Sequence, residues 1–320
     1  MRHLIICLFL LGSVSVINAQ QKPQYTQYYQ NMSVLNPAVT GMYHSMTVRS
    51  GYRTQWQGLE SAPKTSYLTI SKPINIGNTR SGVVDHGVEE PATKSDKQSY
   101  FSSSSHHAIG LVALNDETGP INSTTLNLTY AYHINISDVA NLSVGVGGGF
   151  NRLALNTSKL RFENTDEPVV VNGGNINQWL PDLNAGVYFY SAAFYLGGSI
   201  QQALNKNTVF SNDFKSGKEV PHYFLSSGLR IWIKEDFSVT PSVMLKYVQP
   251  TPLAYDINMK LAYRNNVWIG SSYRVKDSFS AMFGFNVAKA VSLGYAFDNT
   301  TSPIKNVSTG SHEIVLGINF

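Results

Sequence analysis

Histidine is the side chain of this sequence best suited to metal binding and acid–base chemistry, but its spacing favours neither. No pair shows the HExxH arrangement that brings two imidazoles to one zinc ion. His106 and His107 are adjacent, so on a strand they point to opposite faces and cannot share a ligand. We therefore expect surface or rim positions and no metal site. The histidines that follow the first 19 residues are His44, His86, His106, His107, His133, His222 and His312.

Hydrolysis and phosphate binding are the other chemistries whose residue types are present. A hydrolase needs a serine, a histidine and an acid or amide partner in contact, and no GxSxG elbow singles out a serine here. The run Gly145–Gly149, GVGGG, lacks the spacing of the nucleotide-binding fingerprints, and no helix pattern follows it. We interpret its glycines as small residues on the interior face of a strand. The sequence predicts neither an enzyme nor a bound cofactor.

Charged residues form a third group, and many of them alternate with apolar ones. In a membrane barrel such residues face the lumen, because a charge on the lipid face costs about 2–4 kcal/mol at mid-depth. Two arrangements are open: a conducting pore lined by charge, or a lumen filled by paired side chains, by segment 76–105 or by the N-terminal extension. The charges expected in the lumen are Arg49, Arg53, Arg230, Lys246, Asp256, Lys260, Arg264, Asp298 and Glu313.

The segment 254–264, AYDINMKLAYR, indicates which element positions these charges. Apolar and aromatic residues occupy every second position from Tyr255 to Tyr263, and polar or charged residues fill most of the others. Side chains on a strand alternate between its two faces, so one face is apolar and the other polar. At about 3.4 Å per residue and a tilt of about 40°, the two tyrosine rings lie about 20 Å apart along the bilayer normal. This spacing is typical of the aromatic rims of an outer-membrane barrel.

Composition favours the same class. Charged residues make up 14% of the chain and aromatic residues 12%, against about 25% charged residues in soluble domains. After the first 20 residues no apolar stretch is long enough for a transmembrane helix. We therefore expect strands that contact outer-membrane lipid. The small positive net charge of +4 gives no reason to expect nucleic acid as a partner.

The chain divides into a leader, an extension and a barrel. Residues 1–19 have the basic start, apolar core and small-residue cleavage site of a signal peptide, which contains the single cysteine, Cys7. We expect an ordered periplasmic extension over 20–42 and an outer-membrane barrel over 43–320. The serine-rich and charged segment 76–105 is predicted to be a long, mobile insertion.

The barrel region holds fourteen alternating segments, which predicts an all-β, transmembrane antiparallel barrel with periplasmic termini. The short turns then fall on the periplasmic side and the long loops 156–181 and 203–220 outside, whereas the long segment 76–105 lies on the periplasmic side. Apolar residues in the outside loops are candidate anchors for a protein partner. These anchors are Trp179, Leu180, Val209, Phe210 and Phe214.

Several short motifs follow one another in a fixed order. They are QYTQY from Gln24, LNPA from Leu35, YRTQWQG from Tyr52 and APKT from Ala62, followed by Asn115-Asp116, Gly119-Pro120 and the ending Gly310–Ile314. In this combination the chain resembles the PorP/SprF family of the Bacteroidetes type IX secretion system over nearly its whole mature length. The motif residues expected to have structural or partner-contact roles are Asn36, Pro37, Gly41, Tyr52, Arg53, Trp56, Gly58, Pro63, Lys64, Asp116 and Gly119.

The resemblance implies an outer-membrane barrel that serves protein secretion and, in relatives that move by gliding, the delivery or anchoring of a cell-surface adhesin. Its implied partners are that secreted adhesin and periplasmic components of the secretion system. No catalytic residues come with the resemblance. Segment 76–105 departs from the family, which joins the second and third strands briefly. A general solute channel is the alternative function, because a barrel lined by charge is also what a channel requires.

Overall fold

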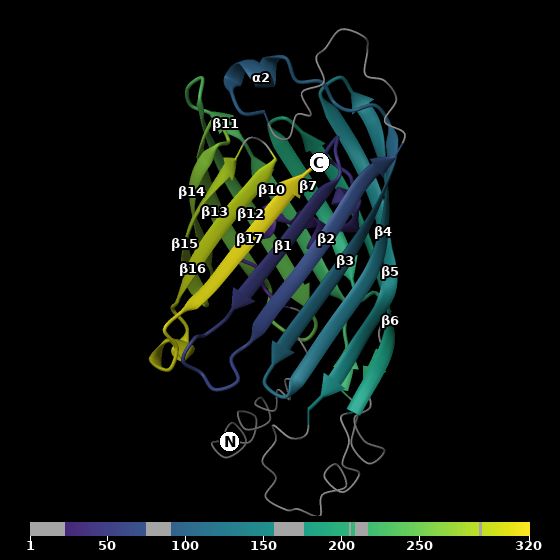
Figure 1. The fold of residues 1–320 in the computed structure, drawn as a ribbon, viewed down its shortest axis with the longest axis vertical. Coiled ribbons are helices and arrows are strands. Elements are labelled where there is room, and N and C mark those ends of the chain that lie inside the picture. Colours follow the sequence, from purple (N-terminus) through teal and green to yellow (C-terminus); the bar gives the residue numbers. More distant parts are fainter. Residues whose placement is uncertain (1–22, 75–90, 157–175, 205, 209–216, 288–289) are drawn as a thin grey trace, which may run out of the picture.

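The fold is a closed antiparallel β-barrel of fourteen strands with almost no helix (Figure 1). The computed structural model describes residues 23–74, 91–156, 176–204, 206–208, 217–287 and 290–320. Each strand pairs with its neighbour in the chain, and β1 pairs with β17 to close the barrel. β10 and β11 occupy one position, since both pair with β12. The predicted fold class is therefore confirmed.

The barrel strands have the following bounds: β1 Thr47–Thr54, β2 Lys64–Ile74, β3 His106–Thr118, β4 Ile121–Ser137, β5 Ala140–Leu155, β6 Ile176–Ser191, β7 Phe194–Gln201, β10 His222–Leu229, β11 Ile231–Trp232, β12 Phe237–Val248, β13 Ala254–Tyr263, β14 Val267–Arg274, β15 Ser278–Val287, β16 Val291–Thr300 and β17 Ser311–Asn319. A two-stranded hairpin, β8 Lys206–Thr208 with β9 Gly217–Glu219, lies outside the barrel sheet.

Alternation of the side chains explains why these residues form a barrel in a membrane. On β13 the apolar residues Ile257, Met259 and Leu261 are exposed on the outer face, whereas Asp256 and Asn258 are buried inside. β15 repeats the pattern, with exposed Phe279 and Phe283 and buried Ser280. An apolar outer face is stable only in lipid, because water would have to hydrate it. Among the described residues, no helix is both long and apolar enough to cross a membrane.

The barrel has two ends, which the pairing distinguishes. We call the end where β1 begins and β17 ends the terminal end, and the opposite end the far end; Thr47 pairs with Asn319 at the terminal end. α2 and β11 lie at this end, at the top of Figure 1. The short connections after β4, β6, β11, β13 and β15 also fall there, as the strand count predicted.

Several strands are longer than their alternation predicts. β4 and β5 extend toward the far end to Ile121 and Leu155, and β6 already begins at Ile176. Trp179 and Leu180 were expected in an outside loop, but they lie in β6, where Trp179 faces outward and Leu180 is buried. The polar residues near them weaken the alternation, while pairing with β5 supplies the backbone hydrogen bonds. Val209, Phe210 and Phe214 lie outside the described residues.

The lumen is occupied by the chain's own N-terminal segment. Residues 23–42, which we call the plug, form three short 3-10 turns inside the barrel: η1 Tyr28–Gln30, η2 Met32–Val34 and η3 Pro37–Val39. We expected an N-terminal extension over 20–42. Its described residues, 23–42, lie in the lumen and are enclosed by the barrel strands. Tyr28, Leu35 and Ala38 belong to the buried hydrophobic cluster, together with Tyr188 and Phe224 from the wall.

A second segment lies across the terminal end. Residues 91–105, which we call the strap, contain the five-residue helix α2 Lys94–Gln98. This part of the predicted mobile insertion is ordered, because Thr93 and Asp96 form a capping box. The strap is also docked at both ends: the backbone N–H of Ser95 donates to Glu235, and that of Ser102 donates to the carbonyl oxygen of Asp138. The remaining part of the expected insertion, 76–90, lies outside the described residues.

Candidate functional site: a lumen closed by the N-terminal segment

Arg53 fixes the beginning of the plug to the seam where the barrel closes. Its guanidinium pairs with Glu313 on β17 at 3.0 Å and with Asp298 on β16 at 2.5 Å, and all three side chains are buried. The same guanidinium donates to the Thr26 hydroxyl at 2.9 Å, and the Thr26 backbone N–H donates to Glu313 at 2.8 Å. Gln27 adds a second backbone N–H to that carboxylate. The plug thus adds hydrogen bonds to buried charges that already pair with one another within the barrel wall.

The Asn36-Pro37 motif fixes the middle of the plug to β5 and β6. The Asn36 side chain caps η3 by accepting from the Ala38 N–H at 2.9 Å, and it donates to the carbonyl oxygen of Val187 at 3.0 Å. Two glycines of the wall leave space for this part of the plug, Gly145 beside the Pro37–Ala38 backbone and Gly186 beside the Asn36 side chain. A Cβ on Gly145 would lie 2.4 Å from the Ala38 nitrogen, and one on Gly186 would lie 2.0 Å from Asn36 Oδ1. The interpretation of GVGGG as small, interior-facing residues is confirmed at Gly145.

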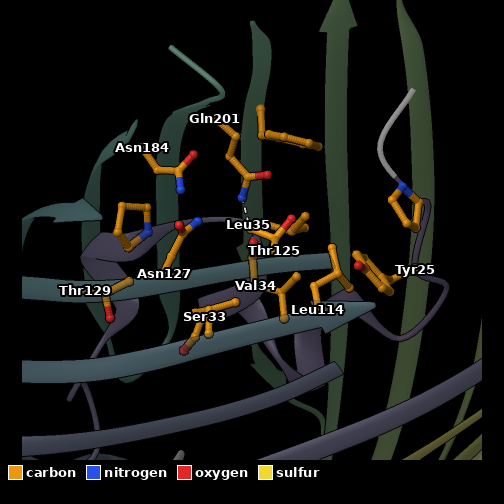
Figure 2. Close-up of a pocket in the computed structure, with 14 residues that line it drawn as sticks. Tyr25, Ser33, Val34, Leu35, Leu114, Thr125, Asn127, Thr129, Asn184 and Gln201 are labelled. Atoms are coloured by element: carbon orange, nitrogen blue, oxygen red, sulfur yellow. Dashed lines mark hydrogen bonds between the residues drawn. The ribbon is translucent and has the colours of Figure 1, made fainter. Parts of the chain in front are cut away.

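Side chains of the wall also bind the carbonyl groups of the plug. Gln201 Nε2 donates to the carbonyl oxygen of Val34 at 2.6 Å, and the Ser199 hydroxyl donates to that of Leu35 at 2.7 Å. The Ser143 hydroxyl does the same for Ala38 at 2.6 Å. Figure 2 shows the Gln201 contact, with Tyr25, Ser33, Val34 and Leu35 of the plug facing Leu114, Thr125, Asn127 and Asn184 of the wall. These bonds satisfy backbone groups that burial would otherwise leave unpaired.

Three histidines belong to this lumen rather than to the surface or rim. The rings of His106 and His133 are stacked with centroids 4.5 Å apart, and His222 is fully buried as well. His133 Nε2 lies 2.8 Å from the carbonyl oxygen of Thr40, and His106 Nε2 lies 3.1 Å from that of Gly41. All three side chains are buried, so the expected surface position is wrong for them. Both ring nitrogens of His106 and of His133 have partners, and an imidazole tolerates burial under that condition. His107 faces outward, as adjacency predicted.

The other predicted motif residues separate into two groups. Tyr52 lies on the outer face of β1, whereas Trp56, Gly58 and Pro63 lie in the hairpin loop at the far end and Lys64 begins β2. Trp56 and Gly58 have left-handed backbone angles, with φ of 49° and 98°, a conformation in which glycine carries no steric cost.

Asp116 links β3 to β2, and Gly119 lies in the neighbouring β3–β4 turn. The carboxylate of Asp116 accepts from the Thr65 hydroxyl at 2.6 Å, and Gly119 takes a φ of 60° at the turn. Only Asn36, Pro37, Gly41 and Arg53 of the predicted set therefore come together in the lumen. Thr26, Gly145 and Gly186 complete the site, although no sequence motif pointed to the last of them.

Most of the charges expected in the lumen lie there. Asp256 accepts from Arg274 at 3.1 Å in a buried pair, and Lys246 and Arg230 are buried. Arg264 is the exception: it lies in the β13–β14 turn, where it is largely exposed and pairs with Asp236. The turn interrupts the strand before Arg264, so the alternation no longer determines its direction. No group of three or more His, Cys, Asp or Glu in the described part of the chain is arranged to hold a metal ion.

Charged residues of the strap and of the barrel take part in docking the strap at the terminal end. Hydrogen bonds from the Ser95 side chain and backbone hold the pKa of Glu235 below its usual range. Lys97 lies over the Trp232 ring at 5.0 Å from the ring centroid. Burial raises the pKa of Tyr100, which lines the space beneath the strap. The strap is thus anchored by groups that water also reaches.

Comparison with solved structures finds other barrels at low sequence identity. The Ralstonia pickettii toluene transporter TbuX shares 11% identity with a TM-score of 0.49, over 89% of this chain and 92% of its own. The Acinetobacter baumannii outer membrane protein Omp33 shares 7% with a TM-score of 0.47, over 88% of this chain and all of its own. The Pseudomonas putida toluene transporter TodX shares 10% identity with a TM-score of 0.46, over 90% of this chain and 92% of its own. None of the curated proteins matches the chain.

Comparison with family models gives a match over almost the entire chain. The model described as type IX secretion system membrane protein PorP/SprF covers residues 17–318, which include the plug, the Arg53 cluster and all barrel strands except the last residue of β17. The family is a secretion component and not a class of enzymes. The chain therefore belongs to the PorP/SprF family, and it is an outer-membrane β-barrel of the type IX secretion system.

Proposed function

We propose that this barrel supports the export or the surface retention of a partner protein, a cell-surface adhesin, and that it catalyses no reaction. The observation that carries the proposal is the occupied lumen. The plug is bound from β1, β4, β5, β7, β16 and β17 through side chains that include Arg53, His133, Ser143, Ser199 and Asp298. A barrel that fills its own interior is suited to anchoring and docking rather than to free diffusion of solutes.

We further propose the orientation and the partners. The terminal end, with its short turns and the strap, faces the periplasm and contacts periplasmic components of the secretion system, whereas the far end faces the outside and contacts the adhesin. Short periplasmic turns and longer outside loops are typical of bacterial barrels. Removal of residues 1–19 as a signal peptide belongs to the same proposal.

A solute channel is the alternative, and one observation favours it. Pockets remain around the plug, among them one between Leu35 and the wall residue Asn127. Single-channel recording in planar bilayers distinguishes the two functions. The anchor proposal predicts no steady conductance of the purified chain; steady conductance on the nanosiemens scale in the absence of a partner would support the channel.

Deletion of the gene tests the cellular role. We expect one secreted protein to disappear from the cell surface while other outer-membrane proteins remain in place, and we expect the wild-type gene to restore it. Mass spectrometry of surface-exposed proteins provides the measurement. Unchanged surface proteins combined with reduced uptake of a small solute would contradict the proposal.

A further inference from the structure

One cation faces the lipid near the terminal end of the barrel. Lys72 lies on the outer face of β2, between the outward-facing Ile70 and Ile74, and its side chain is exposed. It forms no hydrogen bond, ion pair or ring contact with any described residue. In the described barrel strands, no other charged residue faces outward in the half near this end. Hydrocarbon supplies no counter-ion, so such a cation is stable only where it reaches the phosphate groups at the bilayer surface.

A histidine and a tyrosine on the two neighbouring strands also face outward. His107 of β3 and Tyr130 of β4 are both exposed, and His107 Nδ1 lies 2.6 Å from the Tyr130 hydroxyl oxygen. Neither side chain has another hydrogen bond to a described residue. A neutral imidazole and a phenol carry two acidic protons together, and the bond between them uses one. Whichever tautomer is present, one N–H or O–H remains to donate to a further acceptor.

The pairing of the strands brings the lysine and this donor to one patch. Lys72 is opposite Ile109 on β3, and Ile109 is opposite Tyr130 on β4, so the three lie in line across adjacent strands (Figure 1). At about 4.8 Å between strands, the Lys72 and Tyr130 Cα atoms are about 10 Å apart, a gap that a lysine side chain and one phosphate group can fill. The Tyr132 ring lies 4.7 Å from the His107 ring. Tyrosines on a barrel's outer face gather at the level of the lipid headgroups.

We propose that Lys72 and the His107–Tyr130 pair bind the phosphate group of a membrane phospholipid. The ammonium group supplies a charge-assisted contact to one phosphate oxygen, and the remaining N–H or O–H of the pair donates to another. The acyl chains of the same lipid lie along the apolar outer face, where Ile109 is exposed. The site requires only that this face contacts lipid, so it is independent of the proposed role in export.

Lipid binding to the purified full chain in dodecyl maltoside, a detergent without phosphate, tests the proposal. The probes are a phosphatidylglycerol and a diacylglycerol with the same acyl chains but no phosphate. By native mass spectrometry we expect the phospholipid to bind about tenfold more tightly. Inorganic phosphate in excess should not displace it, because the acyl chains add apolar contacts. Equal binding of the two lipids, or complete displacement by inorganic phosphate, would overturn the proposal.

Variants locate the binding. Lys72→Gln should weaken binding of phosphatidylglycerol about tenfold, because it removes the charge-assisted contact. Arg264→Gln is the matched control, since Arg264 is an exposed cation at the same end but pairs with Asp236, and it should leave the affinity unchanged. An equal loss in these two variants would overturn the proposal.

The hydrogen-bond donor is tested separately. His107→Phe leaves the Tyr130 O–H free to donate, and Tyr130→Phe leaves an N–H on His107, so each single variant should retain binding. The double variant has no donor and should bind phosphatidylglycerol more weakly than either. A double variant that binds as tightly as the wild type would contradict the role of the pair.

Solid-state NMR provides a measurement that does not depend on relative affinities. With isotope-labelled lysine and phosphatidylglycerol bilayers, one lysine ammonium nitrogen should show close contact with lipid phosphorus. This signal should disappear in Lys72→Gln and persist in Arg264→Gln. A nitrogen–phosphorus signal that is the same in the wild type and in Lys72→Gln would show that Lys72 does not hold the phosphate.

Discussion

Substitution of Gly145 by alanine tests whether the fit between plug and wall closes the lumen. The new Cβ would lie 2.4 Å from the Ala38 nitrogen and 2.5 Å from the Pro37 carbonyl carbon, about 1 Å closer than ordinary van der Waals contact. These are backbone atoms, so no side chain can rotate away. Gly148 is the matched control from the same GVGGG run, because a Cβ there meets nothing within 4 Å.

The free-energy cost of Gly145→Ala follows from the two ways in which the structure can respond to the added Cβ. If the plug stays in place, overpacking of this kind costs about 1–3 kcal/mol. If the plug moves away locally, it loses the hydrogen bonds from Asn36 and Ser143, each worth about 0.5–1.5 kcal/mol. Both routes give about 2 kcal/mol, which raises the population of the displaced plug roughly thirtyfold.

Cysteine labelling measures that population. The chain has one cysteine, Cys7, which lies in the predicted signal peptide, and Val34→Cys places a reporter at a buried position of the plug. With this reporter, Gly145→Ala should accelerate modification by a membrane-impermeant maleimide about thirtyfold, while Gly148→Ala should have no effect. Equal labelling rates in the two variants would refute the idea that glycine at 145 permits plug docking.

Three further predictions concern the charges and the two barrel ends. Arg53→Met should lower the free energy of unfolding in urea by about 3–5 kcal/mol, because it leaves Asp298 and Glu313 buried without their cation. Arg264→Met, which removes an exposed pair, is the control and should leave the free energy of unfolding unchanged. An equal loss in both variants would contradict the burial argument. Docking of the strap should weaken in acid, because hydrogen bonds from Ser95 lower the pKa of Glu235 in the folded protein. The resulting stabilisation of the docked strap is present above the unfolded pKa of about 4.3 and is lost as pH falls through the folded pKa. Hydrogen exchange at the Ser95 amide, corrected for intrinsic rates, should therefore rise in acid, and it should lose this dependence in Glu235→Gln. For orientation, Ser95→Cys at the terminal end should resist labelling in intact cells whereas Glu60→Cys in the far-end loop should react; preferential labelling at position 95 would reverse the proposed topology.

The sequence alone was sufficient for the barrel because alternation is a local property. A segment such as 254–263 exposes one face to lipid whatever its neighbours are, so residue types in order predict strands, faces and an even strand count. The same argument predicted that Arg53, Asp298 and Glu313 face inward. Strand ends were predicted less well: β6 begins before its alternation becomes clear, since pairing with β5 rather than side-chain pattern determines its length.

Only the tertiary structure determined what fills the lumen. The plug has no periodic pattern, and its position depends on contacts with residues more than 100 positions away, such as Ser143 with Ala38 and Glu313 with Thr26. His133 and His106 were predicted wrongly for the same reason, because Thr40 and Gly41 supply their partners from the plug. Gly186 could not be recognised as part of the site, since a glycine in a strand shows its purpose only when the group that needs the space is known. Such contacts follow from the closing of the barrel around the plug, which no local pattern in the sequence encodes.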